Sequence, residues 1–162
     1  MEKTFLLAVA LLGLSANAAA QATSSTMNVE IESRAITLVN TGELNFGKLL
    51  PYGIAGSLSV ATNGVGTGTN VFLTDATNVR ASTWVVSGIP GASFFVTLPT
   101  SVAISNGTNS MTVTGFYRSG TIQLVLDTAG NRDFAVGARL NVGANQASGV
   151  YTGTFNVTAS YN

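Results

Sequence analysis

The chain has 162 residues, and its seven basic and seven acidic side chains cancel to a formal net charge of zero. Nucleic-acid binding and attachment to anionic lipid both need a concentrated patch of basic side chains, which this sequence lacks. His and Cys are absent, which excludes a Ser-His-Asp triad, a thiolate nucleophile and His or Cys metal ligands. We therefore expect neither enzyme activity nor a cofactor.

Residues 1–22 have the pattern of a secretory signal peptide. Lys3 precedes an apolar run from Phe5 to Leu14, and small and polar residues follow up to Ala22. The run is too short to cross a bilayer core of roughly 30 Å, but it matches the apolar region of a signal that is cleaved after small residues. We predict cleavage after Ala22, no insertion in a membrane, and an exported domain that resides in the periplasm, at the cell surface or outside the cell.

Residues 23–162 have the pattern of a single β-sandwich domain. Short β-branched and aromatic runs alternate with turns rich in Gly, Asn and Pro, at the intervals found in sandwiches and barrels. No sustained helical period follows the signal. The glycine-rich stretch Asn63–Asn70 is expected to be a flexible loop. The predicted strands are Thr26–Ser33, Ala35–Val39, Leu44–Gly47, Ser57–Ala61, Val71–Thr74, Ser82–Ser87, Ser93–Leu98, Val102–Ile104, Ser110–Thr114, Thr121–Leu126, Asp133–Val142 and Val150–Tyr161.

The first predicted strand allows two interpretations. Met27, Val29 and Ile31 alternate with Asn28, Glu30 and Glu32, so one face of a strand over residues 23–33 is apolar and the other is polar and acidic. The segment could be an edge strand of its own domain, with the glutamates discouraging stray pairing. It could equally be a donor strand that completes the sheet of a neighbouring subunit.

The last predicted strand has the clearest alternation in the chain. Its apolar face carries Tyr151, Phe155, Val157 and Tyr161, while threonine, asparagine and serine fill the other face. Because side chains alternate across a strand, this pattern indicates one buried and one solvated face. These four residues are the candidates for a C-terminal pairing strand.

Several segments together resemble a known family. They are Leu44–Gly47, Trp84–Ala92, Phe95–Pro99, Asn106–Gly107, Ser110–Val113, Val136–Val142 and Gly149–Thr158. Their order and spacing resemble the bacterial secreted domain called domain-of-unknown-function family 4402, over nearly all of residues 23–162. That family is similar in turn to spore coat U-type domains and to pilins of archaic chaperone–usher fimbriae.

The resemblance implies an immunoglobulin-like antiparallel sandwich that polymerises by donor-strand exchange. The partners it implies are copies of this chain or related subunits, and a periplasmic chaperone. Tyr161 looks like the C-terminal tyrosine of such pilins. The absence of Cys departs from the many fimbrial subunits that carry a disulfide.

Polar side chains give little sign of chemistry. Glu30 and Glu32 lie roughly 7 Å apart on one strand face, a separation that suits an inverting glycosidase, but a terminal strand offers no apolar cleft to raise a carboxyl pKa. Asp127, Asn131 and Asp133 surround a glycine turn and supply about half of the six to eight ligands that calcium requires. An ordinary hairpin turn is the better interpretation.

The sequence thus favours a non-enzymatic structural or adhesive surface domain, and two alternatives stay open. Tyr52 and Tyr117 adjoin turn residues and could stack on sugars, which would make the chain a self-contained glycan-binding module. A small outer-membrane β-barrel fits less well, because many predicted strands are shorter than the nine to eleven residues that barrels need.

Overall fold

The structure, a computed structural model, describes residues 27–31 and 34–162. The predicted signal peptide and its cleavage after Ala22 lie outside the described residues, and so do residues 23–26 and 32–33 of the predicted donor segment. Ser33–Asn162 form one compact unit, and the residues up to Glu32 belong to a separate unit. The larger unit contains every strand that the structure describes.

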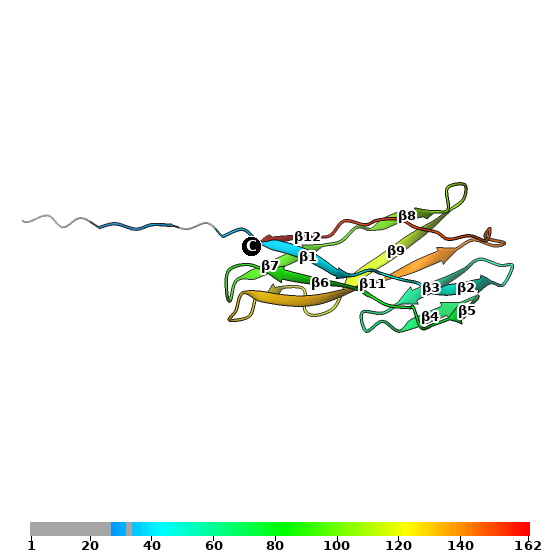
Figure 1. The fold of residues 1–162 in the computed structure, drawn as a ribbon, viewed down its shortest axis with the longest axis horizontal. Helices are drawn as coiled ribbons and strands as arrows, with labels where there is room; N and C mark the ends of the chain where they lie inside the picture. Colours follow the sequence, from blue (N-terminus) through cyan, green and yellow to red (C-terminus); the bar gives the residue numbers. More distant parts are fainter. Residues whose placement is uncertain (1–26, 32–33) are drawn as a thin grey trace, which may run out of the picture. The chain divides into compact units, whose positions relative to one another are not determined.

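Strands dominate this unit, and every ladder between them is antiparallel (Figure 1). The described residues contain no helix, and so none that is long and apolar enough to cross a membrane. The predicted all-β class is confirmed. The strands are β1 (Thr37–Gly42), β2 (Lys48–Pro51), β3 (Gly56–Val60), β4 (Gly66–Thr69), β5 (Val71–Asp75), β6 (Ser82–Ser87), β7 (Ser93–Thr97), β8 (Ser101–Ser105), β9 (Ser110–Arg118), β10 (Leu124–Val125), β11 (Asn131–Val142) and β12 (Thr158–Tyr161).

The long strand β11 organises the largest sheet. Its first half pairs with β6 and its second half pairs with β3, and β9 pairs with residues 136–141 of the same strand. The sheet continues through β6 to β1, through β3 to β4, and through β9 to β8. Two smaller sheets, β10-β7-β12 and β2-β5, complete the unit.

One apolar cluster lies between the largest sheet and the three-stranded sheet. β6 and β11 contribute Val86, Phe134 and Val136, while Phe94 comes from β7 and Leu124 from β10. All five side chains are buried. Two antiparallel layers with their apolar faces together are a sandwich, so the predicted architecture is found in this half.

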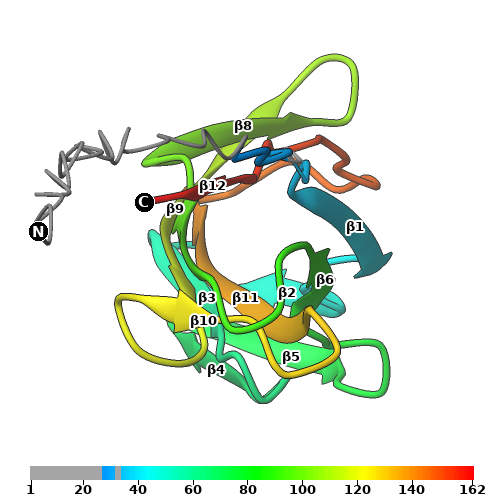
Figure 2. The ribbon, with the colours of Figure 1, turned by 90° about the vertical axis from the view of Figure 1, so that its left-hand side faces the viewer.

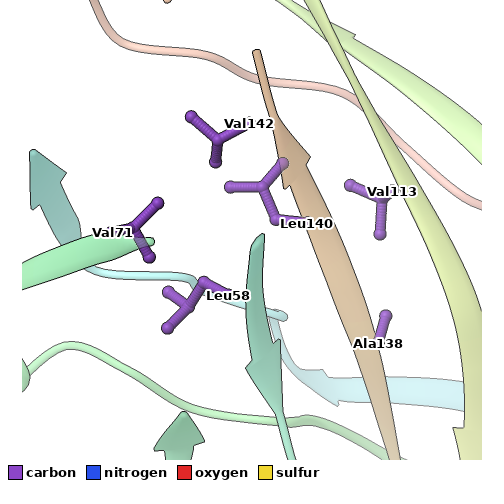
Figure 3. Close-up of a cluster of buried hydrophobic side chains, with 6 residues drawn as sticks. All are labelled: Leu58, Val71, Val113, Ala138, Leu140 and Val142. Atoms are coloured by element: carbon purple, nitrogen blue, oxygen red, sulfur yellow. The ribbon is translucent and has the colours of Figure 1, made fainter. Parts of the chain in front are cut away.

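The second apolar cluster lies at the other end of β11 (Figure 3). It contains Leu58 of β3, Val113 of β9, Val71 of β5 and, from β11, Ala138, Leu140 and Val142. Leu49 and Leu73 of the β2–β5 ribbon pack against it. The ribbon therefore covers this half of the largest sheet, as the three-stranded sheet covers the other half.

The expectation of a flexible loop over Asn63–Asn70 is wrong, because β4 occupies Gly66–Thr69 and pairs with β3. Glycine is depleted in strands, which is why the sequence suggested a loop. Here the missing side chains let neighbours approach the backbone: a Cβ at Gly66 would lie 3.0 Å from Val79, and one at Gly68 would lie 3.0 Å from Val71.

Three other predicted strands are partly wrong. Leu44–Gly47 forms only a bridge between Asn45 and Arg80, since Gly47 turns the chain at φ 71°, and the strand follows at Lys48. Thr121–Leu126 contracts to two residues, because Thr121 and Gln123 form a local hydrogen bond within a bend. Val150–Tyr161 keeps ladder pairing only from Thr158 onward.

Gly137 lies where β11 exchanges one partner strand for the next. The ladder with β6 ends at Val136, the ladder with β3 begins at Ala138, and the register with β9 shifts between Gly137 and Arg139. A Cβ at Gly137 would lie 2.4 Å from the carbonyl oxygen of Val60. The close approach of β3 to β11 therefore requires glycine at this position.

Tyr161 joins the end of β12 to the loop after β6. Its ring packs over Gly88, and its hydroxyl accepts a hydrogen bond of 2.8 Å from the backbone N–H of Ile89. A Cβ at Gly88 would lie 2.0 Å from that hydroxyl. The contact fastens the C-terminal strand to the β6 end of the opposite layer.

We predict that Gly137→Ala lowers the free energy of unfolding by about 1–3 kcal/mol, because the methyl group must push β3 and β11 apart. Urea denaturation measures this difference. Gly143→Ala is the matched control, since its Cβ meets only the end of the flexible Gln146 side chain, and should change stability by no more than about 0.5 kcal/mol. Equal effects of the two substitutions would contradict the prediction.

We also predict that Tyr161→Phe lowers the free energy of unfolding by about 0.5–1.5 kcal/mol, the usual contribution of one hydrogen bond. The ring and its packing remain, so the loss reports the bond to Ile89 alone. Chemical denaturation of both proteins is the measurement, with Gly88→Ala as the larger steric disturbance of the same contact. A Tyr161→Phe variant as stable as the parent would show that the bond does not matter.

Candidate functional site

The C-terminal segment contains a stretch whose backbone pairs with no described residue. Thr152 exchanges two backbone hydrogen bonds of 2.9 and 3.0 Å with Ser105, and Thr158 begins the ladder with β7 opposite Thr97. From Thr97 to Ser105 the chain advances eight residues, whereas from Thr152 to Thr158 it advances six. The two pairings therefore cannot belong to one ladder, and Gly153–Val157 has no hydrogen bond to any other described residue.

Pro99 provides a physical reason for the gap. It lies in the connection between β7 and β8, opposite the unpaired stretch, and proline has no N–H to donate to a ladder. The sequence contained this signal, because Pro99 separates two predicted strands that face the last one. The alternation of apolar residues predicted a single strand over residues 150–161 and did not reveal the interruption.

The side chains of this segment still alternate as the pattern suggests. Phe155, Val157, Ala159 and Tyr161 are half-buried and pack against the cluster between the two layers, while the residues between them are exposed. Tyr151 behaves differently, because its hydroxyl donates to the carbonyl of Ala147 and accepts from Gln146, each at 2.8 Å. Of the four candidate pairing residues, three thus share one apolar row and Tyr151 belongs to a local turn.

Aromatic rings gather beside the unpaired stretch. The rings of Phe155 and Trp84 form a T-shaped pair with their centroids 6.1 Å apart, and the centroids of Phe155 and Phe116 are 5.1 Å apart. The indole nitrogen Nε1 of Trp84 is buried and has no hydrogen-bond partner among the described residues. An unsatisfied buried donor is unusual in a folded protein, and here it belongs to a ring that contacts Phe155 in the unpaired stretch.

A second edge that forms no ladder with any described residue belongs to β1. This strand lies beside β6 and pairs with it (Figure 2), and it approaches β12 without forming a ladder. Ile36 and Leu38 are half-buried against the same apolar cluster as Phe155 and Val157. The edge of β1 and the edge of the C-terminal segment therefore both border this cluster, and they form no ladder with each other.

The candidate donor residues form a short exposed segment. Met27, Val29 and Ile31 are 95%, 85% and 88% exposed, and residues 27–31 form no strand. The prediction of a strand over Thr26–Ser33 is thus wrong for the residues that the structure describes. An extended segment alone cannot satisfy its backbone, so a strand there requires a partner edge.

The candidate sugar-stacking residues lie on different elements. Tyr52 follows β2 and is 60% exposed, whereas Tyr117 lies in β9 opposite Gly137 and is 46% exposed. Neither ring belongs to the aromatic pairs of the described residues. The structure does not bring the two rings together into one site.

Two carboxylates, those of Asp75 and Asp127, accept hydrogen bonds within turns. Asp127 accepts hydrogen bonds of 2.9 and 2.8 Å from the N–H groups of Ala129 and Asn131, as expected for an ordinary hairpin turn. Hydrogen bonds from Thr77 hold the pKa of the Asp75 carboxyl below its ordinary value. Within residues 27–31 and 34–162, no group of three acidic side chains is placed to hold a metal ion.

Comparison with known proteins places this architecture in a family. No curated protein matches the chain. A family model described as "Domain of unknown function (DUF4402)" matches residues 36–161, from the residue before β1 to the end of β12. The match includes every strand of the larger unit and most of the chain, so this chain belongs to the DUF4402 family.

Proposed function

We propose that this chain is a non-enzymatic, exported structural or adhesive subunit that assembles by strand addition. In this proposal, residues 27–31 of one copy pair with the Gly153–Val157 stretch of another copy. The observation that carries the proposal is that the backbone of this stretch forms no hydrogen bond to another described residue, although it lies beside a half-buried apolar row. Export to the periplasm, the cell surface or the outside of the cell rests on the predicted signal peptide.

The donor segment and the acceptor stretch have matching periods. Met27, Val29 and Ile31 alternate with polar residues, and so do Phe155, Val157 and Ala159. In a strand, residues two apart lie roughly 7 Å from each other on one face. Two such rows on adjacent strands lie side by side over the same apolar cluster, so the added strand would cover side chains that are now half-buried.

Two energetic terms favour the addition. Burying an exposed Val, Ile or Met side chain contributes about 1.5–3 kcal/mol, and the three candidate donor residues are almost wholly exposed. The backbone of Gly153–Val157 would also gain ladder partners. Unpaired strand edges invite stray association, so an exported subunit of this kind needs a partner that protects the edge before assembly. A periplasmic chaperone is the partner we propose for that step.

We predict that Val29→Asp abolishes the oligomers of the intact exported chain, because it places a charge in the row that must be buried. Asn28→Asp adds the same charge to the opposite, solvated face and is the matched control. Size-exclusion chromatography with light scattering measures the oligomer mass of both variants. The proposal fails if the two variants assemble equally well.

A peptide of residues 23–33 should bind in trans to the Val29→Asp chain, whose own donor segment is disabled and whose acceptor edge is intact. Fluorescence anisotropy of the labelled peptide measures this binding. A second peptide that carries the Val29→Asp substitution should not bind. Equal binding of the two peptides, or binding of neither, would contradict strand addition at this edge.

A further inference from the structure

The outer face of the β2–β5 ribbon is apolar and exposed. Leu50 and Phe72 are directly opposite in the ladder, and they are 57% and 54% exposed. Tyr52 and Ile54 follow in the next residues of the chain and are 60% and 56% exposed. The inner face of the same ribbon is already used, because Leu49 and Leu73 pack against the second apolar cluster. We call Leu50, Tyr52, Ile54 and Phe72 the ribbon patch.

The ribbon patch contains no charge. The only ionisable pair on the ribbon, Lys48 opposite Asp75, lies at the end of the ladder away from Pro51 and Val71. Exposed neighbouring apolar side chains commonly mark an interaction surface. An uncharged patch favours an apolar protein surface over an anionic lipid headgroup, which needs basic side chains.

The strand register places the ribbon patch at one end of the larger unit. At the Val142 end of β11, Val142 lies opposite Gly56, and Ala55 accepts a hydrogen bond of 3.2 Å from Asn70 just before β5. At the Asn131 end, Asn131 lies opposite Ser87, and Ser87 lies opposite Thr37 of β1. The patch and the start of β1 are therefore at opposite ends of a 12-residue strand (Figure 1).

Strand addition would bring these two ends together in neighbouring copies. The C-terminal segment begins at Thr152, which pairs with Ser105 at the end of β8. It runs to Tyr161, which lies opposite Phe94 near the Asn131 end of β11. Antiparallel pairing, the more stable arrangement, sends the added strand toward the end of the acceptor that carries the ribbon patch. Only the five residues Glu32–Ile36 separate Ile31 from β1, and they span at most roughly 17 Å.

We infer that the ribbon patch is the docking surface for the next copy of this chain, which presents the end that carries its Ile89. Ile89 is 42% exposed in the loop after β6 and lies beside Tyr161, at the Thr37 end. The inference rests on the proposed strand addition. Four side chains fall short of a standard interface of roughly 1,600 Å², so the patch would act only after the added strand holds two copies together.

The first experiment compares Phe72→Glu with Val65→Glu in the intact exported chain. Val65 is 56% exposed in the turn between β3 and β4, does not belong to the ribbon patch, and is the matched control. Sedimentation velocity should show assembly weakened about tenfold or more by Phe72→Glu, the size of effect expected at an interface centre. Assembly that is equal in the two variants would overturn the inference.

The residue 23–33 peptide separates this inference from strand addition itself. The peptide carries no body that could reach the ribbon patch, so it should bind equally to the Val29→Asp chain and to the Val29→Asp/Phe72→Glu chain. Equal peptide binding together with unimpaired assembly of Phe72→Glu would remove the docking surface and leave strand addition standing. If the peptide does not bind to the Val29→Asp chain and the parent chain does not assemble, both strand addition and the docking surface are contradicted.

A cross-link tests which end docks. The chain has no Cys, so Phe72→Cys in one copy and Ile89→Cys in another can be joined selectively by a short bismaleimide. We expect a cross-linked dimer from this mixture and not from Val65→Cys with Ile89→Cys. Equal cross-linking of the two mixtures would overturn the assignment.

Retention on immobilised glycans gives a further test. If the Phe72→Glu chain assembles normally but is no longer retained on the glycans, the ribbon patch binds sugars, and the inference is overturned.

Discussion

The rest of the larger unit depends on the pairing of β11. This strand is bonded on both edges, to β6 and β3 on one side and to β9 on the other. Phe134 and Val136 enter one apolar cluster, and Ala138, Leu140 and Val142 enter the other. Because the chain has no Cys, these packed clusters and ladders must supply the stability that disulfides give to many exported domains. The close contact at Gly137 is where the two halves meet.

The two halves of the largest sheet are not covered by equally complete ladders. The β2–β5 ribbon covers the Val142 half with a two-stranded ladder that is interrupted only by a register shift between Lys48 and Leu49. The other half is covered by β7, β10 and β12, and the C-terminal segment leaves its ladder between Thr152 and Thr158. Half-buried Leu38 and Phe155 lie on this second side, together with the indole N–H of Trp84, which has no partner among the described residues. The exposed edges of the larger unit's apolar core thus lie near the gap in the C-terminal ladder.

The sequence predicts faces better than it predicts partners. β6 has the predicted bounds Ser82–Ser87, because its β-branched run ends at a turn with Gly88 and Pro90. The alternation from Phe155 to Tyr161 correctly indicates which side chains face the core. It contains no information about which backbone lies alongside, so the missing ladder before Thr158 could not be predicted from alternation alone. β4 was missed because a glycine row that accommodates Val71 and Val79 looks like a flexible loop when its neighbours are unknown.

In the candidate site, too, the sequence predicts which residues share a face but not which strands pair. Alternation identified Met27, Val29 and Ile31 as an apolar row, and their exposure agrees with a segment that lacks a partner among the described residues. The acceptor stretch and the ribbon patch depend on contacts between distant parts of the chain, such as Thr152 with Ser105 and Leu50 with Phe72. Such pairings are set by the tertiary fold, and local propensity does not contain them.

The two proposed contacts would solve different parts of one register problem. A slip of one residue in the added strand would turn Asn28 and Glu30 toward the apolar cluster. Such a slip is unfavourable, because it buries a polar amide and a charged carboxylate. A slip of two residues would keep the apolar face inward, so the alternation of the donor cannot prevent it. The short connection Glu32–Ile36 and a docking surface at the ribbon end both oppose such a slip, because it would move the next copy by roughly 7 Å along the strand axis. Specific assembly would therefore need the end contact as well as the strand.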